Sequence, residues 1–225
     1  SKLKKWLESN LVSVNEKVVN KPSYKVTFPA KLELIVPDEN LTEDLAERLD
    51  LKIIKSTKQY IIISKEAGMV VHPGAGNKSG TLLNALLYEY PELKKLPRAG
   101  IVHRLDKDTS GIMVVARNES GMQSLSEQIS TRSIKRIYQA FTVGKIERSG
   151  KIEAPIGRHP KNRQKQAIID SGREAISHYK VIESFGSYSH VEVSLETGRT
   201  HQIRVHMNHL GCPLIGDPLY GRRRR

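Results

Sequence analysis

The chain has 225 residues, which is enough to bury the core of one medium-sized domain with a small appendage. Lys and Arg number 37 against 24 Asp and Glu, and this net charge of +13 favours a polyanionic partner such as nucleic acid over an acidic membrane surface. No window approaches the roughly 20 apolar residues of a membrane helix, and the single cysteine, Cys212, excludes an intrachain disulfide, so a cytoplasmic protein is expected.

Residues 1–40 are expected to form a small α+β unit. Residues 2–8 predict a basic helix, while the turn at 14–18 and the apolar alternation over 31–36 predict short strands. The polar, turn-favouring break at 37–40 is where we place the domain boundary. Residues 41–49 are expected to be a short helical or linker stretch.

Residues 41–225 are expected to form one larger domain with many strands and few helices. Strand patterns occur at 59–64, 68–72, 112–116, 138–143, 166–169, 175–182 and 191–195. Helical patterns occur at 81–90, 119–129 and 200–210, and the last of them is stopped by Gly211 and Pro213. This order favours an α+β fold over a doubly wound parallel sheet.

The densest group of chemically active side chains lies at residues 100–111. It includes His103, Arg104, Asp106 and Asp108, and it runs directly into an apolar strand. A turn with merely solvated charges is one interpretation of this segment. An active-site loop held by a rigid strand is the other, and it explains the density of the side chains better.

Two motifs in this chain resemble those of the RNA pseudouridine synthases, in the family that modifies large-subunit ribosomal RNA. The first reads His-Arg-Leu-Asp at 103–106 with Thr-Ser-Gly at 109–111, and the second reads Leu-Glu-Thr-Gly-Arg-Thr-His-Gln-Ile-Arg-Val-His at 195–206. Residues 64–74, 136–140 and 216–221 also resemble the family. The resemblance implies a central, mostly antiparallel mixed sheet with flanking helices and a catalytic cleft.

The resemblance covers almost the whole chain and departs from the family pattern at both ends. Residues 1–40 resemble the later part of an S4-type RNA-binding domain without its first helix. The catalytic domain, 41–225, is expected to be short at its C-terminus, where it ends in the arginine run 222–225.

The resemblance implies that Asp106 is the catalytic carboxylate. Breaking the N-glycosidic bond of uridine builds positive charge at the anomeric carbon, which a carboxylate stabilises or bonds to. The family pairs its aspartate with an arginine, and we assign this role to Arg199, because a guanidinium would keep the carboxylate ionised. Asp108 is the local alternative for the carboxylate, although it more simply caps the turn.

The resemblance also implies the residues that surround the base. Tyr138 would stack on the uracil and assist proton removal, although a phenol with a pKa near 10 is a poor base. Ile203 and Leu195 would line the opposite side. The target nucleotide must be flipped out of its stack; Arg104 would fill the space it leaves, and His103 would orient the loop through a hydrogen bond.

The predicted function is therefore isomerisation of uridines to pseudouridine. Large-subunit ribosomal RNA is the favoured substrate, and transfer RNA is the alternative. A non-catalytic RNA-binding or ribosome-assembly protein on the same fold is the alternative, and a DNA-binding protein has no motif in its favour. No cofactor, no metal and no obligate protein partner are expected. His201, His206, His209 and Cys212 carry zinc-ligand chemistry, but positions 201, 206 and 209 do not share one helix face well.

Overall fold

The computed structural model describes residues 2–35, 46–74 and 76–221, and it divides the chain into two compact units, residues 1–45 and 46–225. We describe each unit by itself. The domain boundary predicted at residue 40 and the stretch 41–45 lie outside the described residues, so the boundary stays a prediction.

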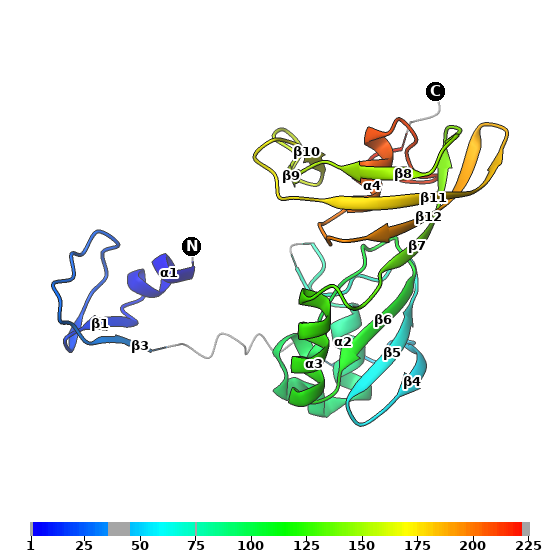
Figure 1. Ribbon diagram of the computed structural model, residues 1–225. Coiled ribbons are helices and arrows are strands. Elements are labelled where there is room, and N and C mark those ends of the chain that lie inside the picture. Colours follow the sequence, from blue (N-terminus) through cyan, green and yellow to red (C-terminus); the bar gives the residue numbers. More distant parts are fainter. Residues whose placement is uncertain (1, 36–45, 75, 222–225) are drawn as a thin grey trace. The chain divides into compact units, whose positions relative to one another are not determined.

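The N-terminal unit is a short helix beside a small antiparallel sheet (Figure 1). Its elements are α1 (Lys2–Glu8), β1 (Val12–Val14), β2 (Lys17–Val18) and β3 (Leu32–Leu34), with strand order β2-β1-β3. Val14 and Val19 are buried, whereas Leu32 and Leu34 are exposed. The basic helix and short strands predicted here are confirmed, and the likeness to an S4-type domain stays a prediction.

The first sheet of the larger unit is antiparallel, with order β4-β5-β6. Its strands are β4 (Lys52–Ser56), β5 (Tyr60–Lys65) and β6 (Gly111–Ala116), and α2 (Leu82–Glu89) and α3 (Glu119–Ser130) lie beside it (Figure 1). The strand predicted over 68–72 is wrong. The chain turns at Gly68, where φ is +91°, and Val70 forms only an isolated bridge to Thr81.

The second sheet is also antiparallel and carries the remaining long strands. Its order is β7 (Ile137–Val143), β12 (Tyr188–Leu195), β11 (Ile176–Phe185), β8 (Gly150–Glu153). Helix α4 (Gln202–His209) packs on this sheet, where Met207 joins Val191 and Val193 in one apolar cluster. A two-stranded hairpin, β9 (Ile156–Arg158) and β10 (Gln166–Ile168), completes the strands of the described residues.

The predicted α+β class with antiparallel sheets and few helices is confirmed. The single central sheet that the resemblance implied is instead two sheets, β4-β5-β6 and β7-β12-β11-β8. Two short 3₁₀ helices, η1 (Pro91–Lys95) and η2 (Pro97–Gly100), lead from α2 to the loop at 101–110. Among the helices of the described ranges, none has the length and apolar character to cross a membrane.

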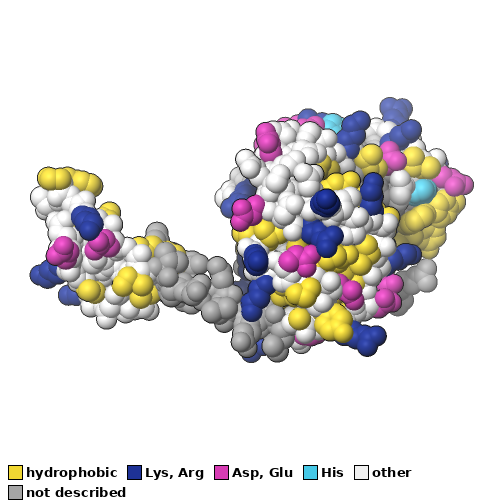
Figure 2. Space-filling model, turned by 90° about the horizontal axis from the view of Figure 1, so that it is seen from below, with side chains coloured by type: hydrophobic (Ala, Val, Ile, Leu, Met, Phe, Trp, Pro, Cys, Tyr) yellow, Lys and Arg dark blue, Asp and Glu magenta, His cyan; other side chains and the backbone are white. Residues whose placement is uncertain are grey.

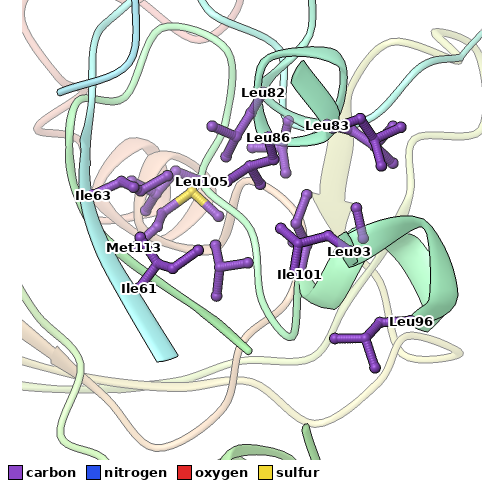
Figure 3. Packing of buried hydrophobic residues seen from close by; sticks show 14 residues of the cluster. Ile61, Ile63, Leu82, Leu83, Leu86, Leu93, Leu96, Ile101, Leu105 and Met113 are labelled. Atoms are coloured by element: carbon purple, nitrogen blue, oxygen red, sulfur yellow. The ribbon is translucent and has the colours of Figure 1, made fainter. Parts of the chain in front are cut away.

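The hydrophobic core beside the first sheet holds the loop at 101–110 in place through Leu105. Figure 3 shows Leu105 among Ile63, Leu86 and Met113, which come from β5, α2 and β6. Burying a leucine contributes about 1.5–3 kcal/mol. Because Leu105 directly precedes Asp106, its burial also fixes the point at which the aspartate leaves the core.

Gly100 sets the path into the loop. Its φ of +76° lies in the left-handed region, and a Cβ there would overlap the carbonyl oxygen of Ala116 on β6. We predict that Gly100→Ala lowers the free energy of unfolding by about 2 kcal/mol or more, measured by urea denaturation. Gly74→Ala is the matched control, because a Cβ there meets nothing within 4 Å. Equal stability of the two variants would contradict this account.

Candidate active site

A pocket of about 320 Å³ opens in the larger unit beside the loop at 101–110. Its wall is formed by this loop, by β7, by the end of β12 and by residues 198–204 at the start of α4. All of the residues that the sequence analysis assigned to the site line it: His103, Arg104, Asp106, Tyr138, Leu195, Arg199 and Ile203.

Buried groups hold the loop that carries Asp106. The Lys65 side chain is 1% exposed, and its Nζ donates to the carbonyl oxygens of Glu66, Met69 and Lys107 at 2.8, 2.9 and 3.1 Å. Burial lowers the pKa of Lys65, against the opposing effect of the nearby aspartates of the loop. The Gly68 N–H also donates to the Lys107 oxygen, at 2.8 Å, so the loop is tied to the turn after β5.

His103 ties the loop to β6 through a backbone hydrogen bond. Its Nε2 accepts from the Val114 N–H at 3.0 Å, which requires that this nitrogen be unprotonated. Burial lowers the pKa of His103, and the positive charge of Arg136 lowers it further. The imidazole is therefore neutral, and it provides the contact that orientation of the loop requires.

Arg204 is the cation that pairs with Asp106. The Asp106 side chain is 18% exposed, and its Oδ2 lies 3.3 Å from Arg204 Nη1. Arg204 Nε and Nη2 donate to the two carboxylate oxygens of Asp217 at 2.7 and 2.9 Å. One guanidinium therefore binds Asp217 through a bidentate fork and offers another N–H to Asp106.

The ion pair predicted between Arg199 and Asp106 is wrong. Arg199 lies in the turn before α4, and its Nε donates to the carbonyl oxygen of Glu174 at 2.9 Å. Its backbone N–H donates to Gln202 Oε1, also at 2.9 Å. Arg199 therefore lines the pocket without pairing with Asp106. Arg204 lies on α4, and its guanidinium contacts both Asp106 and Asp217.

Asp217 is held by its own turn as well as by Arg204. Its side chain is 2% exposed, and Oδ1 accepts the backbone N–H groups of Leu219 and Tyr220 at 2.8 and 3.0 Å. Burial would raise the pKa of Asp217, but these hydrogen bonds and Arg204 outweigh it and lower the pKa below the ordinary value. The carboxylate is ionised and fixed in place.

Tyr138 presents an aromatic side chain to the pocket. It is half-buried on β7, and burial raises the pKa of its phenol, although Arg136 opposes this effect. The hydroxyl therefore stays protonated at neutral pH, which argues against the predicted assistance to proton removal. A neutral ring beside the pocket still suits stacking on a flat base.

The site contains residues to which the sequence analysis gave no role: Arg204, Asp217, His201 and Tyr220. His201 Nε2 lies 4.0 Å from Asp106 Oδ2, and its Nδ1 lies 2.9 Å from the Tyr220 hydroxyl. All four belong to the motif segments 195–206 and 216–221. The many polar residues in these two segments could have marked them as part of the site. Which side chains pair with one another depends on the fold and could not be predicted from the segments.

The described residues hold no group of three or more His, Cys, Asp or Glu side chains arranged for a metal ion. His206 instead has both ring nitrogens engaged inside the fold. Nδ1 lies 2.9 Å from Ser177 Oγ, and Nε2 lies 3.1 Å from the Ala154 carbonyl oxygen. This histidine fastens α4 to the second sheet.

Comparison with known proteins gives a consistent result. The family described as RNA pseudouridylate synthase matches residues 59–209. "Ribosomal large subunit pseudouridine synthase D" of Pseudomonas aeruginosa is 49% identical, over 100% of this chain and 70% of that protein. The protein of the same name from Pasteurella multocida is 46% identical, over 100% and 69%. The solved structure of human RNA pseudouridylate synthase domain containing 1 has a TM-score of 0.64 and 27% identity, over 77% of this chain and 71% of that chain.

We expect substitutions of Arg204 and Arg199 to lower stability by different amounts. Arg204→Gln leaves the buried Asp217 carboxylate without its cation, so we expect the free energy of unfolding to fall by about 3 kcal/mol at pH 7. Arg199→Gln removes one bond to a carbonyl and should cost less than about 1 kcal/mol. Urea denaturation of both variants measures the difference.

The pH dependence of stability tests whether Asp217 causes the loss in Arg204→Gln. The pKa of Asp217 is lowered in the fold, so its stabilising effect is present above the ordinary value of 3.8 and is lost as the pH falls below it. The gap between Arg204→Gln and the parent should therefore shrink in acid. A gap that stays constant would exclude Asp217 as the source of the loss.

Proposed function

The chain belongs to the RNA pseudouridylate synthase family, and we propose that it isomerises uridine to pseudouridine in large-subunit ribosomal RNA. The names of its relatives support this substrate over transfer RNA. The observation that carries the proposal is Asp106, a single half-buried carboxylate that an arginine holds at a pocket of base-binding size.

We assign the bond-breaking step to Asp106. As the N1–C1′ bond breaks, positive charge develops at C1′, and the carboxylate stabilises it or bonds to carbon. The uracil then rotates, C5 bonds to C1′, C5 loses its proton and N1 gains one. The Arg204 guanidinium lies 3.3 Å from Asp106 Oδ2 and holds the carboxylate in position for this step.

The walls of the pocket suit a flipped nucleotide. Tyr138 presents a ring on one side, and Leu195 and Ile203 provide apolar surface elsewhere in the lining. Arg104 is exposed and lines the pocket, and it would replace the departing base in the stack.

The β9–β10 hairpin is the segment that we assign to RNA contact. On the face shown in Figure 2, Lys and Arg side chains are interspersed with acidic and hydrophobic ones. The β9–β10 hairpin is different, because residues 158–165 carry several cations and no acidic residue: Arg158, Lys161, Arg163 and Lys165. The start of β10 is linked to the pocket wall through Tyr220, whose hydroxyl accepts the Gln166 N–H at 2.7 Å and lies 2.9 Å from Nδ1 of the lining residue His201.

The remaining assignments follow from the same function. We propose that residues 1–40 contribute RNA contacts in the manner of an S4-type domain and that residues 41–225 hold the catalytic domain. We also propose that the enzyme works in the cytoplasm, where ribosomal RNA is modified and a single cysteine stays reduced.

The central test is the release of tritium from ribosomal RNA labelled at uridine C5. We expect Asp106→Asn to lower the rate by at least about 10³-fold, because it removes the charge and nearly keeps the shape. Asp108→Asn is the matched control, since it removes a neighbouring carboxylate, and it should stay within about 10-fold of the parent. Equal release by the parent and Asp106→Asn would show that Asp106 is not the catalytic carboxylate. No release by the folded parent would contradict the proposed function.

The hairpin is tested by the salt dependence of RNA binding. Neutralising Lys161 and Arg163 to Gln should reduce the slope of log Kobs against log salt by about 0.7 for each lost phosphate contact. Neutralising Lys55 and Lys58 to Gln removes the same charge from the β4–β5 hairpin and should leave the slope closer to that of the parent. Identical slopes for the two double variants would exclude the hairpin as an RNA contact.

A further inference from the structure

The proposed reaction needs a base that removes the proton from C5, and this inference rests on that proposed function. Most groups of the pocket are unsuitable. His103 Nε2 already accepts the Val114 N–H, and burial raises the pKa of the Tyr138 phenol. Asp106 Oδ2 is held by Arg204 at 3.3 Å, and Asp106 is assigned to the sugar.

His201 is the remaining basic side chain of suitable chemistry in the pocket lining. Its side chain is 15% exposed, and its Nε2 lies 4.0 Å from Asp106 Oδ2, beyond hydrogen-bond distance. Its backbone φ of +58° is left-handed, a conformation that a non-glycine residue adopts at an energetic cost and that recurs at functional sites. This backbone places the ring immediately before α4, next to the catalytic carboxylate.

Tyr220 supports His201 from the side away from Asp106. The Tyr220 hydroxyl accepts the Gln166 N–H at 2.7 Å, and it lies 2.9 Å from His201 Nδ1 and 3.3 Å from the Gln166 carbonyl oxygen. The hydroxyl proton can therefore point to His201 or to Gln166. When it points to Gln166, Nδ1–H donates to the hydroxyl and Nε2 carries a free lone pair.

The same arrangement has room for a proton on both ring nitrogens. An imidazolium donates from both nitrogens, and here Nδ1–H meets the Tyr220 oxygen while Nε2–H faces the Asp106 carboxylate. His201 can therefore gain a proton at Nε2 without rearrangement of its surroundings. This is the property that a general base requires.

We propose that His201 Nε2 removes the C5 proton after C5 has bonded to C1′. The C5–H bond breaks, its electron pair forms the C5–C6 double bond, and the electrons of the C6–N1 double bond move to N1. N1 takes a proton from water, and the imidazolium returns its own proton to solvent. No oxidant, metal or cofactor takes part in this step.

The charges around His201 agree with this role. Burial lowers its pKa, Asp106 and Asp217 raise it, and Arg204 and Arg104 lower it, with a net decrease. The ring is therefore neutral at pH 7 in the free enzyme and available to accept a proton.

The test compares single-turnover rates on RNA that carries hydrogen or deuterium at uridine C5. We expect His201→Gln, which keeps the size of the side chain, to lower the rate by about 10²-fold and to raise the isotope effect above that of the parent. Tyr220→Phe removes only the supporting hydroxyl and should show a smaller loss with an isotope effect in the same direction. Urea denaturation and RNA binding confirm that each variant is folded and binds as the parent does.

Chemical rescue gives an independent readout. Added imidazole should restore part of the activity of His201→Ala, and more basic imidazoles should restore more. A merely structural role would show neither this dependence nor the larger isotope effect.

Three results would overturn the proposal. They are a His201→Gln rate within about threefold of the parent, a lowered rate with the isotope effect of the parent, and a parent that makes no pseudouridine. The last would refute the proposed function together with this inference, whereas the first two would refute His201 alone.

Discussion

One guanidinium shared by two carboxylates is the interaction on which the site depends. Arg204 binds Asp217 through two N–H groups and reaches Asp106 with a third. Burying three charges is unfavourable unless each is paired and hydrogen-bonded, and here the backbone of the 217–220 turn completes the pairing. Because Asp217 fixes the plane of the guanidinium, Asp106 meets a cation of defined position.

The rest of the larger unit brings these charged groups together. Leu105 in the core, Lys65 under the loop and His103 against β6 fix the aspartate from the side of the first sheet. Helix α4, which is packed on the second sheet, supplies Arg204. The pocket thus lies where two separately stabilised parts of one domain meet, and neither part alone holds both the acid and its cation.

The sequence was sufficient for the class of fold and for the location of the site, since every assigned residue lines the pocket. It led to Arg199 as the partner of Asp106, whereas the structure pairs Asp106 with Arg204 of the same motif. That choice depends on where α4 begins and where the distant Asp217 turn packs, and both are tertiary effects. The strand predicted at 68–72 failed for a similar reason, because an apolar run with Gly68 fits a turn as well as a strand.

The most direct measurement is a crystal structure of Asp106→Asn bound to an RNA that contains the target uridine. This account predicts a flipped uridine whose C1′ contacts the side chain at position 106, with its base on the ring of Tyr138 and with Arg204 still forked on Asp217. A uridine bound away from position 106, or an Arg204 turned from Asp217 to a phosphate, would contradict it.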